Sequence, residues 1–298
     1  ALTVLTAAAQ DSKDTKDLRQ ARLNTEVLLH QLDKDIREDL RPLLIQPFLA
    51  AQATASKGEI EGLNQSVKQE LAKRCVQTVA SKYPFKKGVQ ASEDVPFSDL
   101  AAYFHPQVGS FWKFYQAKLQ PAVQEENGRW VIKTSDLPIA PGFLDILHHT
   151  DLITQSLFGK GSPEPRVSFD IRPNGVPGID EIRLKVDGRD LLYRNEKEEW
   201  YQFVWPGSSD NAGANVEVVF SGGKELLTLK FEGRWGFFKL LDAGRVIQMS
   251  PTEYIVEWTI APVGGTPAKV KFDLRTDSAK NPIVPGLFSK FRCPTQVG

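Results

Sequence analysis

The spacing of apolar residues changes once along this 298-residue chain, and that change limits the folds it can adopt. Before residue 160, apolar side chains recur every three or four positions, which is the period of a helix. After residue 161, they alternate with polar ones over short runs, as in strands. The linker-like stretch GKGSPEP (159–165) separates the patterns. We predict an α+β multidomain chain, with an α-helical domain over 1–160 and an antiparallel β-sandwich with one short helix over 161–298.

The helical half carries one long apolar stripe that includes a cysteine. The stripe consists of Ile60, Leu63, Val67, Leu71, Cys75 and Val79. A cysteine in line with such a stripe packs as a small buried hydrophobe. A shorter stripe precedes it, at Leu28, Leu32, Ile36 and Leu40, and Pro42 and Pro47 follow where one helix should give way to another. DVPFSDLAAYF (94–104), GSFWKFYQAKLQP (109–121) and APGFLDILHHTDLITQSLF (140–158) predict three further helices.

The second half contains short alternating runs bounded by Gly, Pro, Asn and Asp, as in an antiparallel sandwich. The runs are RVSFDIRP, IDEIRLKVDGRDLLYR, EWYQFVWPG, ANVEVVF, ELLTLKFEG, EYIVEWTI and AKVKFDLR. The Asp-Gly pair within VDGRD predicts a tight hairpin turn. SGGKE is also interpreted as a hairpin turn, and RWGFFKLLDAG predicts the one short helix.

Charge and composition exclude several classes of protein. Lys plus Arg and Asp plus Glu number 37 each, so we expect no nucleic-acid or anionic-membrane surface. No apolar run is long enough to cross a bilayer, and the first residues lack the basic start of a signal peptide. The chain also lacks an initiator methionine, which suggests one soluble part of a longer or processed chain. Two cysteines cannot by themselves form a zinc site.

Two groups of residues deserve weighing as metal or acid–base sites. His148 and His149 are adjacent, and Asp145 lies four residues before His149, but adjacent helical side chains point about 100° apart. A third ligand would have to come from His30 or His105. We interpret the pair as a solvated helix face and predict no metal site. Glu196, Glu198 and Glu199, beside Lys197, are typical of a solvated hairpin end.

The sequence lacks the common motifs of catalytic and cofactor-binding sites. The sequence contains no nucleophile elbow, phosphate loop, HExxH or dinucleotide fingerprint, so we expect no enzyme activity, cofactor or small-molecule substrate. The aromatic run from Trp200 to Trp205 could form a stacking platform. Because neighbours in a strand face opposite sides, at least half of these aromatics should be core.

A series of motifs in fixed order gives this chain its resemblance to a known family. The motifs are KYPF (82–85), DVPFSDLAAYF (94–104), FWKFYQAKLQP (111–121), SFDIRP (168–173), VDGRDLLY (186–193), WPG (205–207), GRWGFFKLLD (233–242) and the closing NP...LFSKFRCP (281–294). From about residue 80 to 294, the chain resembles the carboxy-terminal region of the TssM (IcmF-like) proteins of bacterial type VI secretion systems. HPQVG (105–109) and GRD (188–190) depart from the family pattern, but neither departure affects a residue expected to take part in chemistry.

The resemblance implies a structural part of a trans-envelope membrane complex. Such a region lies in the periplasm, belongs to an inner-membrane protein, binds the outer-membrane lipoprotein TssJ, and assembles with TssL and further TssM copies. It also implies that Phe288 and Phe291 are packed anchors and that Arg292 pairs locally. A periplasmic setting permits disulfides. Pairing Cys75 with Cys293 would join a helix of one domain to the end of the other, so two free thiols are expected.

The partner surface is expected in a loop at one end of the sandwich. The loop over residues 206–214 is longer than a hairpin needs, and its candidate contact residues are Pro206, Gly207, Ser208, Ser209, Asp210, Asn211 and Gly213. An ordinary solvated connection is an equal interpretation. Two alternative functions stay open. One is a carbohydrate-binding or hydrolytic β-domain that uses Trp200 or Trp205 with Glu196 or Glu199, and the other is an IcmF homologue of a type IV (Dot/Icm) system.

Overall fold

The computed structural model describes residue 24 and residues 41–87, 91–133, 137–159, 161–194, 199–220, 226–260 and 267–298. The chain divides into two compact units. The first comprises Ala1–Glu70, Lys118–Asp145 and Pro294–Gly298, so far as these are described, and the second comprises Leu71–Ala117 and Ile146–Cys293. Helices predominate before residue 160 and antiparallel sheets follow, which confirms the predicted α+β fold class.

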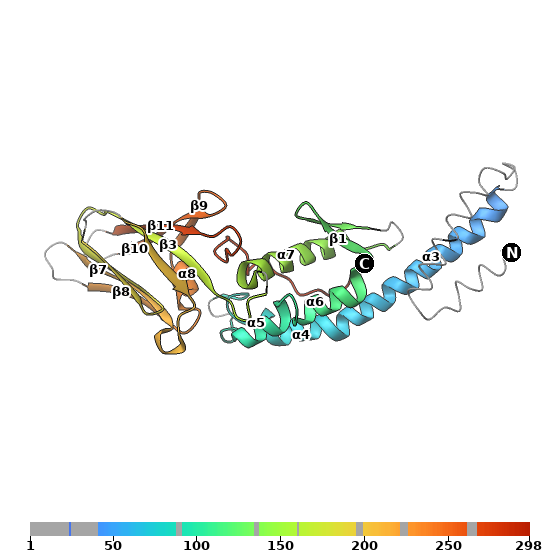
Figure 1. The fold of residues 1–298 in the computed structure, drawn as a ribbon, viewed down its shortest axis with the longest axis horizontal. Coiled ribbons are helices and arrows are strands. Elements are labelled where there is room, and N and C mark those ends of the chain that lie inside the picture. The colour runs from blue at the N-terminus through green and yellow to red at the C-terminus, as the bar shows by residue number, and fades with distance from the viewer. Residues whose placement is uncertain are drawn as a thin grey trace. The chain divides into compact units, whose positions relative to one another are not determined.

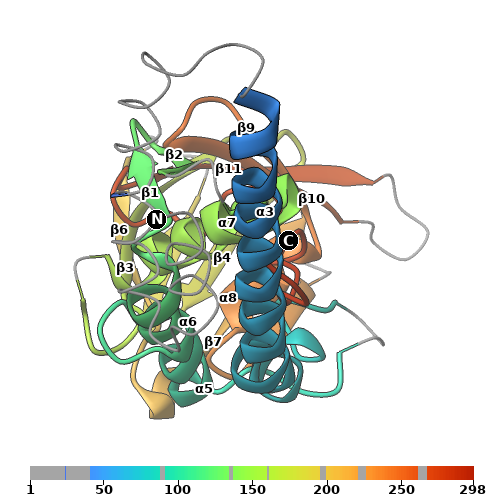
Figure 2. The same ribbon diagram turned by 90° about the vertical axis from the view of Figure 1, so that its right-hand side faces the viewer.

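Helix α3 (Arg41–Ser66) is the long helix of the first unit, and it runs unbroken in both views (Figures 1 and 2). Pro42 lies in its first turn, where the missing N–H would have no helical acceptor. Pro47 lies inside the helix, so the predicted change of helix there was wrong. A proline removes one backbone hydrogen bond, and the helix continues on both sides of it. The stripe from Leu28 to Leu40 falls outside the described residues.

The predicted stripe from Ile60 to Val79 is buried along its whole length. After α3 the chain continues as η1 (Val67–Ala72), α4 (Lys73–Cys75) and η2 (Val76–Ala80), and η1 and η2 are π-helical. Apolar residues here recur every four positions, a spacing that would drift around an α-helix of 3.6 residues per turn. The wider i→i+5 turns of a π-helix keep them on one side.

The first unit also contains a hairpin that the sequence analysis did not predict. Strands β1 (Val123–Glu126) and β2 (Arg129–Ile132) pair antiparallel. Asn127 and Gly128 have φ of 52° and 77°, as a tight primed turn requires. On α3, the Asn64 side chain accepts a hydrogen bond from Val297 N at 2.6 Å and donates one to Gly298 O at 2.8 Å. Residues 294–298 therefore lie against α3.

Three helices were predicted here, and the first two have aromatic buried faces as expected. They are α5 (Phe97–Phe104), α6 (Ser110–Phe114) with the π-helical turn η4 (Tyr115–Leu119), and α7 (Pro141–Phe158). The chain turns at Gln120 and Pro121, where α6–η4 was expected to end. Thr154 joins three of these helices, since its Oγ1 accepts from Trp112 Nε1 at 2.8 Å and donates to Phe104 O at 2.9 Å.

The remainder of the second unit is a sandwich of two antiparallel sheets, drawn as two layers in Figure 1. The five-stranded sheet has the order β6-β3-β11-β10-β9, and the four-stranded sheet β5-β4-β7-β8. The strands are β3 (Val167–Asn174), β4 (Ile179–Val186), β5 (Arg189–Tyr193), β6 (Tyr201–Trp205), β7 (Gly213–Phe220), β8 (Leu226–Glu232), β9 (Arg245–Gln248), β10 (Glu253–Ile260) and β11 (Ala268–Thr276).

Alternation along the strands fills the space between the sheets. Val167, Phe169 and Ile171 of β3 are buried, while the residues between them are at least partly exposed. The β4–β5 turn is the predicted one, with φ of 47° at Asp187 and 84° at Gly188. Helix α8 (Gly236–Asp242) is the predicted short helix and contacts β7, β8 and β9. The SGGKE turn lies outside the described residues.

Candidate partner-binding site

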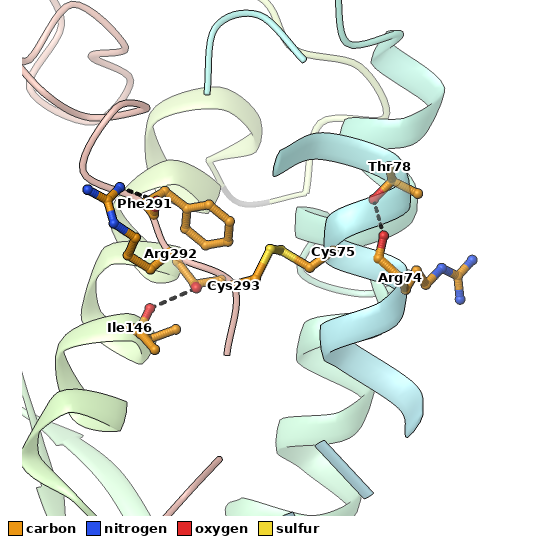
Figure 3. The surroundings of a disulfide bond; sticks show 8 residues. Arg74, Cys75, Thr78, Ile146, Phe291, Arg292 and Cys293 are labelled. Carbon is orange, nitrogen blue, oxygen red and sulfur yellow. Dashed lines mark hydrogen bonds between the residues drawn. A yellow bond between two sulfur atoms is a disulfide. The ribbon is translucent and has the colours of Figure 1, made fainter. Parts of the chain in front are cut away.

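The C-terminal segment is fastened to the helical part of the second unit by a disulfide between Cys75 and Cys293 (Figure 3). Their Cα atoms are 5.8 Å apart, within the normal range for a bridged pair. The expectation of two free thiols was therefore wrong. It assumed that the chain ends inside the sandwich. After β11, however, the chain leaves the sheet and returns to the helix that carries Cys75.

Two phenylalanines of this segment are packed anchors, as the resemblance implied. Phe288 and Phe291 are 7% and 5% exposed. The Phe291 ring lies 5.2 Å from that of Phe104 and 5.4 Å from that of Phe85, measured between centroids. Arg292 bonds locally, to the carbonyl oxygens of Ser289 and Phe291 at 2.8 Å each (Figure 3 shows the second bond). The closing signature LFSKFRCP is therefore a packing and fastening element.

The family motifs meet in one aromatic core. Trp205 of WPG and Trp235 of GRWGFF have ring centroids 5.2 Å apart, and both rings contact Phe97 of DVPF. Tyr83 of KYPF contacts Trp235 at 6.2 Å and donates to the Asp242 carboxylate at 2.8 Å. Burial, with the nearby Asp242 carboxylate, raises the pKa of the Tyr83 hydroxyl. These residues hold the helices against the sandwich.

Of the two adjacent histidines, His149 has a structural role. His148 is exposed, whereas His149 is half buried and its Nε2 lies 2.5 Å from Leu287 O. Burial lowers the pKa of the His149 imidazole. His105 is buried, and its Nδ1 accepts from the backbone N–H groups of Gln107 and Val108, while His30 lies outside the described residues. Among the residues that the structure describes, no three His, Cys, Asp or Glu side chains form a metal site.

The aromatic run around β6 is divided between core and surface, as predicted. Phe203 and Trp205 are each 1% exposed, so Trp205 cannot stack on a sugar. Trp200 is 37% exposed, with the guanidinium carbons of Arg172 and Arg275 at 4.8 and 4.5 Å from its ring centroid. The two arginine side chains thus already lie over the Trp200 ring as cation–π partners. Glu196 and Glu198 lie outside the described residues, and Glu199 is exposed.

The loop over residues 206–214 is pinned to the β4–β5 turn. Gly213 N donates to the Asp187 carboxylate at 2.8 Å, and Asp187 N donates to Gly213 O at 2.8 Å. The same carboxylate accepts from Gly207 N, and burial raises its pKa. A Cβ on Gly207 would lie 2.5 Å from Asp187 Cβ and 2.6 Å from Asp187 O. This contact fixes one end of the loop against the turn.

The middle of the loop presents polar groups outward. Ser209–Asn211 form the 3-10 turn η5, and Ser208, Asp210 and Asn211 are exposed, whereas Pro206, Gly207 and Gly213 are only partly exposed. The predicted site residues therefore share one short surface segment. The signal that the sequence analysis missed is Asp187, whose place in a Val-Asp-Gly turn gave no hint that it holds this loop.

The structure thus defines a class of protein in which a helical module is joined to a β-sandwich. The residues of its sequence motifs pack in the core. Two family models match in succession, the type VI secretion protein IcmF helical domain over residues 59–163 and the IcmF C2-like domain over 169–278. The chain belongs to the TssM/IcmF-like family of type VI secretion proteins.

Individual relatives agree. The type VI secretion system component TssM1 of Pseudomonas aeruginosa is 26% identical over 228 residues, covering 74% of this chain. The chain spans about a fifth (20%) of that relative's length. The solved TssM C-terminal domain (869-1107) from EAEC is 25% identical, with a TM-score of 0.70 over 80% of this chain and 99% of that one.

A chain of a type VI secretion system membrane core complex has the same fold, with a TM-score of 0.76 over 99% of this chain and 61% of that one, at 23% identity. None of the described helices combines the length and the apolarity that a membrane crossing needs.

Proposed function

We propose that this chain is a structural part of a type VI secretion membrane complex, in which it holds partner proteins and catalyses no reaction. The observation that supports this most is the succession of the IcmF helical and C2-like matches over residues 59–163 and 169–278. The family motifs build an aromatic core, which fits a scaffold. The matched models are described as type VI proteins, which favours this machine over the type IV alternative.

We place the region in the periplasm. The Cys75–Cys293 disulfide supports this location, because disulfides persist in oxidising compartments and are rare in the cytosol. We also propose residues 1–160 and 161–298 as the helical and β-sandwich domains of the family.

The partner that we propose is the outer-membrane lipoprotein TssJ, with TssL and other TssM copies as further partners in the full assembly. The loop over residues 206–214 supports a contact site, because a rigid turn holds it while Ser208, Asp210 and Asn211 face solvent. Interfaces of this kind place polar groups at a rim around a few buried anchors.

Isothermal titration with the soluble domain of TssJ tests this function. We expect one-to-one binding with a Kd of about 1 μM or tighter. Asp210→Lys should weaken binding by about tenfold, because it reverses a charge at the exposed tip of the loop. Asp190→Lys is the matched control, since Asp190 is exposed on β5 outside the loop. Absence of binding by the unaltered chain would exclude TssJ as its partner.

A further inference from the structure

A groove of about 1020 Å³ lies beside the loop, wholly within the second unit. The outer faces of β3 and β6 form its floor, with Ser168 opposite Val204 in register and Gln202 further along β6. Residues 162–166 form one wall. The β4–β5 turn and Pro206, Gly207 and Ser208 of the loop line it as well.

The charges of the groove favour an anion. Its lining holds four basic side chains, Arg166, Arg189, Arg234 and Lys280, against two acidic ones, Glu164 and Asp187. Arg166 and Arg189 are exposed, and neither forms an ion pair within the described part of the chain. Asp187 accepts hydrogen bonds from the backbone of Gly207 and Gly213, and among these bases its charge acts on Arg234. Guanidinium groups bind carboxylates with two parallel hydrogen bonds.

Arg234 is already positioned at the groove. Its guanidinium carbon lies 4.5 Å from the centroid of the Phe97 ring, and its carbonyl oxygen accepts from Trp205 Nε1 at 2.6 Å. Its Nε is buried and has no hydrogen-bond partner among the described residues. The nearest carboxylate, that of Glu164, is 3.9 Å away. A buried donor without a partner is satisfied when a ligand or water reaches it.

The floor of the groove ends at an open sheet edge. Of the strands that the structure describes, β6 pairs only with β3. An edge strand offers backbone N–H and C=O groups to an incoming extended segment. An extended segment of protein fits a groove along such an edge better than a lipid headgroup does, because a headgroup has no backbone to pair.

We propose that this groove binds an extended acidic segment of a protein partner, with Arg166 and Arg189 holding its carboxylates beside the edge of β6. The inference rests on the proposed function, because it states the chemistry that the partner presents next to the 206–214 loop. Arg234, which also lines the groove, supplies a further donor.

Fluorescence anisotropy with a labelled peptide of alternating Glu and Ser tests the groove, with a Lys and Ser peptide as the opposite charge. The chain should bind the Glu peptide and not the Lys peptide, more weakly as ionic strength rises to about 0.15 M. Arg166→Glu with Arg189→Glu should weaken binding by about tenfold or more. Lys73→Glu with Arg74→Glu, an exposed basic pair on α4, is the matched control and should bind like the unaltered chain.

Circular dichroism verifies folding, and Arg189→Gln serves in place of the double variant if that does not fold. Equal binding by the groove and control variants overturns the proposal. So does failure of the unaltered chain to bind the Glu peptide, or binding only to phosphatidylglycerol vesicles.

Titrating TssJ into the same proteins separates the two proposals. If the groove variant still binds TssJ as the unaltered chain does, the groove proposal is wrong and the proposed function stands. If the groove variants lose peptide binding but the unaltered chain does not bind TssJ, the proposed function is wrong and the groove proposal stands.

Discussion

The sulfur atoms of Cys75 and Cys293 are bonded to each other across a sequence separation of 218 residues. A cross-link of this span limits the unfolded chain strongly, and its loss typically lowers stability by about 2–5 kcal/mol. We expect Cys75→Ser with Cys293→Ser to lower the urea midpoint by a corresponding amount. Each single variant should lose as much as the double one, because the pair acts as a unit.

Reduction of the unaltered chain should reproduce the effect, and mass spectrometry before and after alkylation verifies the bond. A midpoint that does not respond to reductant would mean that the disulfide adds no stability.

The Phe291 ring packs edge-on against the stacked rings of Phe85 and Phe104. Phe291→Ala should lower the free energy of unfolding by about 3–5 kcal/mol, because a large buried ring leaves a cavity. Met249→Ala is the control, since Met249 is 62% exposed and its truncation should stay within about 0.5 kcal/mol. Urea denaturation followed by tryptophan fluorescence measures both. Equal effects would show that the tail is not packed in solution.

The Thr154 hydroxyl is the shared polar atom between Trp112 Nε1 and Phe104 O. Thr154→Val keeps the shape but removes the hydroxyl, and should destabilise by about 1–3 kcal/mol because buried polar groups lose a partner. Thr154→Ser retains the hydroxyl and should recover most of this loss. If serine and valine variants unfold at the same denaturant concentration, the hydroxyl contributes nothing.

The lowered pKa of His149 predicts a dependence of stability on pH. The unfolded histidine titrates near 6.5, and the folded one, held neutral by burial, titrates lower. The unfolded state therefore takes up the proton first as pH falls, so this residue's share of stability is present above about 6.5 and lost below it. His149→Gln should lose less stability between neutral and acidic pH than the unaltered chain does.

Urea midpoints across that range measure the difference. His148→Gln should keep most of this dependence, because burial is a larger cause of the lowered His149 pKa than the His148 charge is. The same slope for both variants would rule out a role for His149.

Gly207 lies against the β4–β5 turn, where a Cβ would meet Asp187 at 2.5 Å. Gly207→Ala should displace the turn or the loop and destabilise by about 1–3 kcal/mol. Gly178→Ala is a poor control because of its positive φ, whereas Gly142, with open space around it, is a good one. Thermal unfolding compares the two variants. A harmless Gly207→Ala would show that the loop and turn are not in contact.

The spacing of apolar residues predicted most of the secondary structure, because in an amphipathic helix or strand the apolar residues repeat with the period of that element. The strands from β3 to β8, β10 and β11 were found where the runs alternate. The β1–β2 hairpin was missed although Asn127-Gly128 is a strong turn signal, because its strands have only four residues each. Strand β9 is only four residues long and carries too little pattern to detect.

The candidate site was harder to predict, because its parts come from distant positions. Nothing local in the sequence relates Asp187 to Gly213, or Arg166 to Arg189. The disulfide was missed for the same reason: the return of the chain after β11 is a tertiary event. Burial of the stripe at Cys75 was correct, and it gave no information about a bonding partner.

Strand β11 has a consequence for the order in which the protein can be completed. It lies between β3 and β10, and so joins the pair β6-β3 to the pair β10-β9. A nascent chain that has emerged only as far as residue 260 holds two separate ribbons in place of one sheet. Two-stranded ribbons are marginal on their own in water. Both ribbons must therefore wait, exposed to proteases and chaperones, until β11 (Ala268–Thr276) is delivered.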